Sequence, residues 1–232
     1  MPASFSVLLL TAPPPGMGTE SGGGFTKIDG REAVLRSAEL FLNRENITQI
    51  QVIVSQEGFD EARRKFGGHF GFTGVKLVSS GPGWMKQIAA AAMTLSAGVS
   101  HVIVHDTARP AVSYADIDAL LEAAETYPAV ALTSPLRSSL VELDEGGGAL
   151  AFHPANRYAQ LVTPQAYSRE RLLKMAETEA EVHASEVHLL KGSSLNLRAG
   201  GSGDAGLLKS MIAMLPKPKV KPPSSPFEEA QW

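Results

Sequence analysis

Short apolar segments alternate with stretches of helical periodicity in the first half of this chain, and this alternation restricts the fold more than any other feature. The apolar segments are typical of buried strands: 5–10, 50–55, 75–78, 101–106 and 129–134. The stretches between them repeat apolar residues at helical spacing: 31–44, 59–66, 84–97 and 114–127. The pattern predicts an α/β, Rossmann-like fold, in which helices flank a mostly parallel twisted sheet.

The pattern changes after residue 135. "SSLVEL" and "ALAFHP" flank the glycine turn "DEGGG", which predicts a protruding two-stranded β-arm at about 137–157. A two-stranded ribbon cannot bury both of its faces alone, so we expect the arm to pack on a second copy in a homodimer. Helices are expected near 168–180, 184–191 and 204–215, with a short strand over 194–198. Residues 1–214 then form a single domain, and the Pro- and Lys-rich segment 215–232 forms an extended or disordered tail.

Composition excludes several classes of protein. The chain has 232 residues, 44% of them apolar, which is enough for a continuous core. A formal charge of −3 gives no reason to expect a nucleic-acid partner, and the absence of cysteine excludes disulfides and thiolate chemistry. The apolar run at 5–12 is too short to cross a membrane and lacks the features of a signal peptide. We therefore expect a cytoplasmic protein without membrane contact.

The loop "TAPPPGMGTESGGGFTK" at 11–27 follows the first predicted strand and is rich in glycine. Gly16, Gly18 and the run at 22–24 allow backbone amides to turn towards an anion. An ordinary flexible loop explains the glycines equally well. A dinucleotide-binding loop should lead straight into a helix, whereas "FTKIDGRE" intervenes here. This spacing counts against an NAD(P)-dependent reductase, which we keep as a remote alternative.

The segment "HVIVHDTARP" places an acid, a cation and a proline at the end of a predicted strand. Asp106 ends the strand, and Arg109 and Pro110 follow. An acid at this position can hold a metal or a sugar hydroxyl, and a nearby arginine can bind phosphate. A structural ion pair that fixes a tight turn is the alternative. Open parallel sheets bind ligands at the carboxyl ends of their strands, which favours the functional interpretation.

"VIVHDTARPAVS" closely resembles the His-Asp-Ala-Ala-Arg-Pro signature of the 2-C-methyl-D-erythritol 4-phosphate cytidylyltransferases of the non-mevalonate isoprenoid pathway. The similarity continues in the family's order through "FTKIDGREAVLRS", "SSGPGWMKQIAAA", "PLRSSL", "ANRYAQLVTPQAY", "ASEVHLL" and "KGSSLNLR", roughly residues 5–214. The resemblance implies a fold like that of nucleotide-diphospho-sugar transferases. It also implies transfer of CMP from CTP to a phosphorylated polyol with release of pyrophosphate, assisted by Mg²⁺ or another divalent cation.

The resemblance also implies roles for individual residues. The catalytic group would be Asp106, Arg109 and Arg198, with Asp106 also binding the metal. The polyol phosphate would contact Ser139, Arg157 and Thr163, with Arg157 reaching the site of the partner subunit. The nucleotide would contact Gly16, Gly18, Gly81 and Lys27.

The nucleotide loop departs from the family's pattern in its charges. Glu20 stands where the family has an arginine, and Gly23 stands where it has a lysine. Losing one preorganised charge contact in a transition state costs about 3–4 kcal/mol. We therefore expect impaired activity, and the alternative is a pseudoenzyme that binds a nucleotide or phosphosugar. Further departures from the family's residues are Trp84, Gln87 and Ser138.

Overall fold

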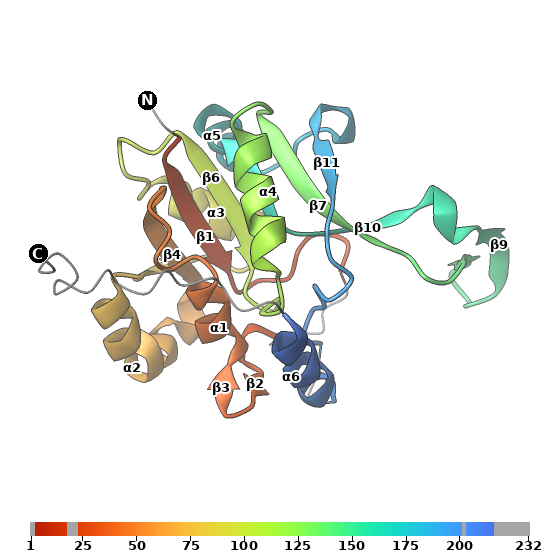
Figure 1. The fold of residues 1–232 in the computed structure, drawn as a ribbon, viewed down its shortest axis with the longest axis horizontal. Helices are drawn as coiled ribbons and strands as arrows, with labels where there is room; N and C mark the ends of the chain where they lie inside the picture. The colour runs from red at the N-terminus through yellow and green to blue at the C-terminus, as the bar shows by residue number, and fades with distance from the viewer. Residues whose placement is uncertain (1–2, 18–22, 201–202, 216–232) are drawn as a thin grey trace, which may run out of the picture.

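A seven-stranded sheet forms the centre of the molecule in the computed structural model, which describes residues 3–17, 23–200 and 203–215 (Figure 1). The strands lie in the order β11-β7-β10-β6-β1-β4-β5. In chain order they are β1 Phe5–Leu10, β4 Ile47–Ser55, β5 Lys76–Ser80, β6 His101–Asp106, β7 Ala129–Pro135, β10 Ala159–Ser168 and β11 His188–Lys191. β10 runs antiparallel to both of its neighbours, and the other pairs in this sheet are parallel. The predicted α/β class with a mostly parallel sheet is confirmed.

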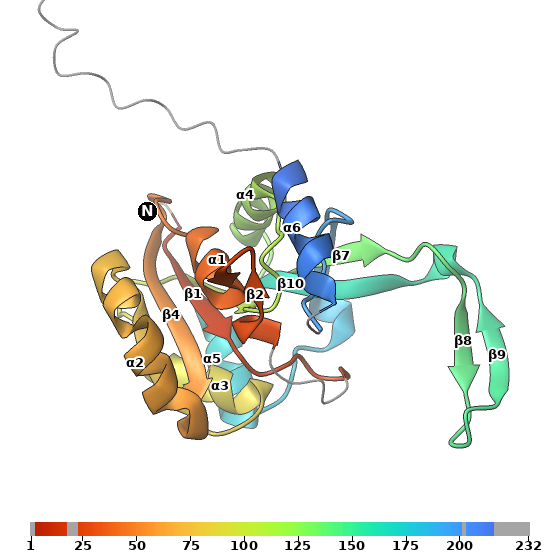
Figure 2. The same ribbon diagram turned by 90° about the horizontal axis from the view of Figure 1, so that it is seen from below.

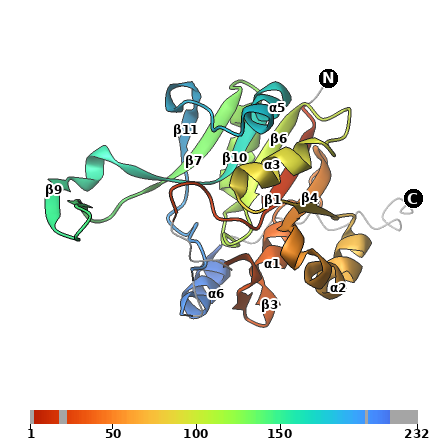
Figure 3. The same cartoon turned by 180° about the vertical axis from the view of Figure 1, so that it is seen from behind.

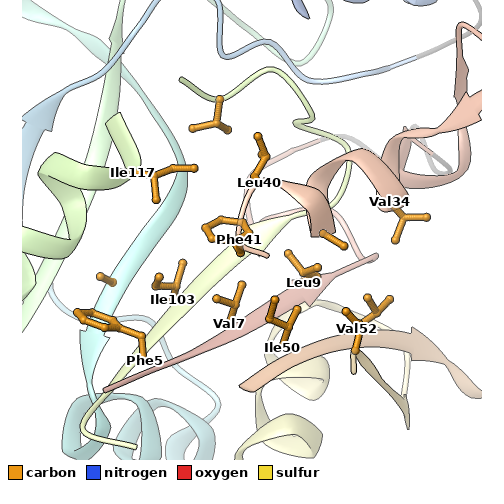
Figure 4. Packing of buried hydrophobic residues seen from close by; sticks show 14 of the residues in the cluster. Phe5, Val7, Leu9, Val34, Leu40, Phe41, Ile50, Val52, Ile103 and Ile117 are labelled. Atoms are coloured by element: carbon orange, nitrogen blue, oxygen red, sulfur yellow. The ribbon is translucent and has the colours of Figure 1, made fainter. Parts of the chain in front are cut away.

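Helices cover both faces of the sheet (Figures 1 and 3). α1 (Ala33–Glu39), α2 (Gln56–Thr73) and α4 (Tyr114–Ala124) pack on one face, and α3 (Trp84–Ala92) and α5 (Arg169–Thr178) pack on the other. β1 contributes Val7 and Leu9 to the first layer and Leu8 and Leu10 to the second. Figure 4 shows Val7 and Leu9 within the first layer. Burial on both faces explains why the strand is a continuous apolar run.

The order of the strands determines where a ligand can bind. The chain passes from β1 to β4 and β5 on one side and then returns to β6 on the other side of β1. β1 and β6 pair in register, so that Leu10 lies beside Asp106 at their carboxyl ends. The loops after these two strands therefore separate at a topological switch point, which is the usual ligand site of an open α/β sheet.

The first helix begins later than predicted because a β-hairpin precedes it. β2 (Lys27–Ile28) and β3 (Arg31–Glu32) pair around Asp29 and Gly30, which have φ angles of 52° and 79°. An Asp–Gly pair with left-handed backbone is the preferred two-residue hairpin turn. The hairpin removes 31–32 from the helix predicted at 31–44, and a turn follows at residues 40–43, so the segment is helical only over Ala33–Glu39.

The C-terminal half contains the larger corrections. The sequence analysis missed β10, which lies between β7 and β6. The helix predicted at 184–191 is wrong: a 3₁₀ turn, η3 (Ala184–Glu186), leads into the edge strand β11. The strand predicted at 194–198 is also wrong, because those residues form a loop. The last predicted helix is present as α6, Asp204–Met214. Residues 216–232 of the predicted tail lie outside the described part of the chain, and the single-domain division stays a prediction.

The predicted arm is present as a separate two-stranded sheet, β8 (Leu140–Leu143) and β9 (Ala149–His153). It projects away from the central sheet (Figure 2). Three of its apolar side chains are largely exposed: Leu143 by 59%, Leu150 by 63% and Phe152 by 77%. Among the residues that the structure describes, no helix is long and apolar enough to cross a membrane.

Candidate active site

Asp106 ends β6 and is completely buried. Its Oδ2 accepts a hydrogen bond of 2.7 Å from Nε of Arg198, and its Oδ1 accepts one of 2.9 Å from the backbone N–H of Ala108. The side chain of Arg198 is 9% exposed, so the ion pair is shielded from water. Asp106 therefore holds Arg198 in place at the carboxyl end of the strand.

Arg109 brings a second buried guanidinium group to the same carboxylate. Its Nη1 donates to the carbonyl oxygen of Asn196 over 2.8 Å. Its Nε lies 3.9 Å from Oδ2 of Asp106 and has no hydrogen-bond partner among the described residues. Burial lowers the pKa of Arg109, the carboxylate of Asp106 raises it, and the charge of Arg198 lowers it again. Two guanidinium groups thus share one carboxylate, which leaves an excess of positive charge in a buried site.

Thr163 and His105 connect this site to β10. The hydroxyl of Thr163 accepts from the backbone N–H of Asp106 over 3.0 Å and lies 3.1 Å from Nδ1 of His105. Nε2 of His105 lies 3.1 Å from the carbonyl oxygen of Arg109. Since that carbonyl can only accept, Nε2 carries the proton and Nδ1 accepts from Thr163. Burial lowers the pKa of His105 to about 3, so the ring is neutral and fixes the turn after β6.

The expected metal role of Asp106 does not fit this geometry. Both oxygens of its carboxylate already accept hydrogen bonds, one of them from an arginine. Magnesium is held in proteins by carboxylate oxygens together with water and substrate phosphates. The described residues contain no group of three or more acidic or histidine side chains that could hold a metal. The metal role of Asp106 therefore stays a prediction that this geometry does not favour, and we derive no step through a protein-held metal.

A pocket of about 110 Å³ lies beside the arginine pair, between the start of the glycine-rich loop and β10. Its lining comes from the loop, from the first turn of α3, from the segment after β6 and from β10 and the segment after α5: Pro14, Pro15, Met17, Trp84, Arg109, Leu161, Val162, Thr163, Gln165 and Glu181. Of the predicted site residues, Arg109 and Thr163 line it. The sequence analysis gave Gln165 and Glu181 no role, although Gln165 lies in the segment "ANRYAQLVTPQAY" that resembles the family.

Gln87 fixes the beginning of the glycine-rich loop. Its Oε1 accepts from the backbone N–H groups of Thr11 and Ala12 over 2.9 and 3.1 Å, and its Nε2 donates to Oγ1 of Thr11 over 3.1 Å. The side chain is buried. This residue therefore anchors the loop to α3.

Gly23 lies against the segment that carries Arg198. A β-carbon at Gly23 would lie 2.1 Å from the carbonyl oxygen of Ala199 and 2.7 Å from Cβ of Ala108. Only glycine fits so close an approach, and the backbone leaves no room for a lysine. Two other residues of this loop, Gly18 and Glu20, lie outside the described residues.

The remaining predicted residues lie around the pocket or away from it. Gly16, with a φ of 74°, and Gly81 are exposed on the loops after β1 and β5. Lys27 is exposed on β2 and forms no ion pair with any residue that the structure describes. Ser139 and Arg157 are exposed at the two ends of the arm, and neither lines the pocket of its own chain.

Comparison with known proteins agrees with this architecture. Residues 11–202 match the family model for 2-C-methyl-D-erythritol 4-phosphate cytidylyltransferase. The enzyme of that name from Rhodopirellula baltica is 27% identical over 218 residues, covering 84% of this chain and 88% of the relative. The Frankia casuarinae enzyme of the same name is 27% identical over 177 residues, which is 74% of this chain but only 65% of the relative.

Solved structures show the same fold. The 4-diphosphocytidyl-2C-methyl-D-erythritol synthase of Anaerococcus prevotii superposes with a TM-score of 0.72 at 15% identity, covering 92% of this chain and 100% of that one. The 2-C-methyl-D-erythritol 4-phosphate cytidylyltransferase of Thermus thermophilus gives 0.69 at 19% identity, with 92% and 100% covered. Because the family model matches most of its length, this chain belongs to the 2-C-methyl-D-erythritol 4-phosphate cytidylyltransferase family.

Proposed function

We propose that this chain transfers the cytidylyl group of CTP to 2-C-methyl-D-erythritol 4-phosphate, with release of pyrophosphate. The observation that carries the proposal is the buried pairing of Arg109 and Arg198 with the single carboxylate of Asp106, beside the pocket. We infer the substrates from the family to which the chain belongs. We infer the site of their phosphates from the excess of positive charge on the two arginines.

The charge excess needs an anion. A buried guanidinium without a full counter-charge costs free energy, and a phosphate oxygen that accepts from it removes that cost. Arg109 lines the pocket, and within the described residues it donates one hydrogen bond, to Asn196. The other N–H groups of its two Nη atoms are the donors that a phosphate would use, since Nε is buried.

In the proposed reaction an oxygen of the polyol phosphate attacks the α-phosphorus of CTP. The bond from that phosphorus to the bridging oxygen breaks, and its electron pair leaves with pyrophosphate. Arg109 and Arg198 stabilise the negative charge that builds on the phosphoryl oxygens. Asp106 orients Arg198 and so acts as a positioning group. Gly16, Gly18, Gly81 and Lys27 are assigned to the nucleotide.

The polyol phosphate is assigned to Thr163 and to two residues of the arm, Ser139 and Arg157. We propose that the chain is a homodimer in which the arm packs on the second subunit and brings Arg157 towards the partner's pocket. The exposed apolar side chains of the arm support this, because such a surface is rarely left in water. The apolar side chains concerned are Leu140, Val141, Leu143, Leu150 and Phe152.

The alternative is a relative that binds a nucleotide or phosphosugar with little turnover. The close packing of Gly23 favours it, because no cation can stand at that position. The remote alternative of an NAD(P)-dependent reductase has no support from the family to which the chain belongs.

The test is pyrophosphate release from CTP and 2-C-methyl-D-erythritol 4-phosphate, with and without Mg²⁺, together with calorimetric titration of CTP. Release with a micromolar KM for CTP would support the transferase. Binding of CTP without release would support the alternative. Neither binding nor release would overturn both.

A further inference from the structure

Gln87 holds the first two residues of the glycine-rich loop from inside the protein. Its side chain is 1% exposed, and all three of its hydrogen bonds to the loop go to Thr11 and Ala12. Thr11 has a second support, because its Oγ1 donates to the carbonyl oxygen of Ile53 in β4 over 2.8 Å. Ala12 has none: among the described residues, Oε1 of Gln87 is the one acceptor for its buried N–H. Removal of Gln87 would therefore leave that donor without a partner.

Three consecutive prolines, at positions 13–15, follow Ala12. A proline has no N–H to donate, and its ring fixes φ at about −65°. The run is therefore stiff, and it cannot be tied to the sheet by backbone donors of its own. In the described part of the loop, the next backbone N–H that donates is that of Met17, to the carbonyl oxygen of Pro14 over 3.3 Å, within the loop itself. The direction of the loop is thus set at Thr11 and Ala12 and carried forward by the prolines.

Gln87 also belongs to a helix that forms part of the pocket. Pro14 and Pro15 line the pocket from the loop, and Trp84 lines it from the first turn of α3. Gln87 lies in the next turn, where its N–H donates to the carbonyl oxygen of Gly83 over 3.1 Å. One buried side chain therefore fixes the loop relative to the helix that carries Trp84.

We infer that Gln87 is a positioning residue for the nucleotide. It fixes Thr11 and Ala12, and the stiff run at 13–15 then holds Gly16 where the phosphates bind. This inference rests on the proposed function, in which Gly16 contacts the nucleotide. Gln87 does not itself touch the ligand. Its effect is to hold the loop in one conformation before CTP arrives, so that binding does not have to order the loop.

The first experiment titrates the full-length chain with CTP and Mg²⁺ by calorimetry and compares it with Gln87→Met. Methionine has a similar length, but it cannot accept from the two backbone N–H groups or donate to Thr11. The Kd for CTP should therefore rise about tenfold or more. Urea unfolding of the same variant measures the loss of stability that accompanies the change.

Gln49→Met is the matched control. Gln49 is likewise buried, at 6% exposure, and it also accepts from a backbone N–H, that of Ser96 over 3.1 Å. Its Nε2 donates to the carbonyl oxygen of Thr94 over 2.8 Å. It lies near the amino end of β4, at the opposite end of the sheet from the pocket. The control should lose a comparable amount of stability and keep the Kd of the unaltered protein.

The second experiment tests whether the effect of Gln87 passes through the prolines. Pro13 does not line the pocket, so Pro13→Gly loosens the backbone between Ala12 and the pocket without removing a lining residue. Pro13→Gly should weaken CTP binding although the hydrogen bonds of Gln87 remain. Adding Gln87→Met to it should then weaken binding less than Gln87→Met does alone. Fully additive effects would overturn the proposed path.

The outcomes separate this inference from the proposed function. An unchanged Kd in Gln87→Met, or equal losses of affinity in Gln87→Met and Gln49→Met, overturns the inference even if the unaltered protein releases pyrophosphate. Weaker CTP binding in Gln87→Met alone supports the inference, and it does so even if no pyrophosphate is released, a result that overturns the proposed reaction. An unaltered protein that binds no CTP overturns both.

Discussion

Nε of Arg198 donates a hydrogen bond of 2.7 Å to Oδ2 of Asp106, across 92 positions of the chain. The bond joins the end of β6 to the segment that leads into α6. Both side chains are buried, so the pair is protected from screening by solvent. The acid of the "HDTARP" segment thus combines the two interpretations that its sequence left open: it is a structural ion pair, and it positions a cation at the ligand end of the sheet.

Asp106→Asn should destabilise the protein strongly. The substitution leaves two buried guanidinium groups without a counter-charge, and breaking a buried pair from one side costs about 3–5 kcal/mol. Urea unfolding measures this loss. Glu179→Gln is the control, since its pair with Lys86 is exposed and should contribute little. A free energy of unfolding close to that of the unaltered protein would contradict the ion-pair role.

Arg198→Gln should lower kcat for pyrophosphate release about 10²–10³-fold, the loss typical of one preorganised charge contact. Arg198→Lys keeps the charge near Asp106 and should restore most of the rate. Circular dichroism establishes that each variant is folded before its rate is compared. Equal losses in both variants would mean that the charge itself is not what the reaction uses.

Gly23→Ala should destabilise the protein by about 1–3 kcal/mol, because the new methyl group meets the carbonyl of Ala199 at 2.1 Å and the backbone must move. Gly68→Ala is the matched control. Gly68 is exposed within α2 with open space around it, so alanine there should stabilise by about 0.5–1 kcal/mol. If Gly23→Ala proved neutral in urea unfolding, the close packing of this loop would be refuted.

Phe152→Asp should weaken the proposed dimer. The side chain is 77% exposed in the single chain, so its loss should change the stability of the subunit little while placing a charge in the subunit interface. Sedimentation at several concentrations should show a shift towards monomer. Phe72→Asp, 92% exposed on α2, is the control and should leave the association unchanged. A dimer of unaltered affinity in Phe152→Asp would rule out the arm as the interface.

The free energy of unfolding should fall in acid through His105. Burial lowers the pKa of this ring to about 3 from the ordinary value of 6.5. Between these values the unfolded chain binds a proton that the folded chain does not. The contribution of the neutral His105 ring to the free energy of unfolding is therefore complete above pH 6.5. It declines by about 1.4 kcal/mol per pH unit as the pH falls towards 3. His105→Gln should flatten this dependence in urea unfolding from about pH 4.5 to 7. The exposed His69, changed to Gln, should keep the slope of the unaltered protein.

The sequence determined the layered α/β architecture because its strands are buried on both faces and its helices on one. Strands 5–10 and 101–106 agree with β1 and β6 at both ends, and the "DEGGG" turn correctly indicates the arm. These features depend on local composition. β10 was missed because it contains Pro164 and is stabilised by pairing with β6 and β7, which its own residues do not encode. The prediction of a helix in place of β11 is wrong for a related reason: this strand is stabilised by pairing with β7, which its own residues do not encode.

The candidate site also combines features that the local sequence predicts with features that depend on tertiary contacts. The sequence alone placed Asp106 and Arg109 at the end of a strand. The two residues are only three positions apart, so they lie close together in any fold. Only the tertiary structure decided that Arg198 neutralises that acid, that Gly23 has no space for a side chain and that Gln165 and Glu181 face one pocket. Each of these relationships joins segments far apart in the chain, and the distance between such segments is set by how helices and strands pack rather than by the residues of either segment.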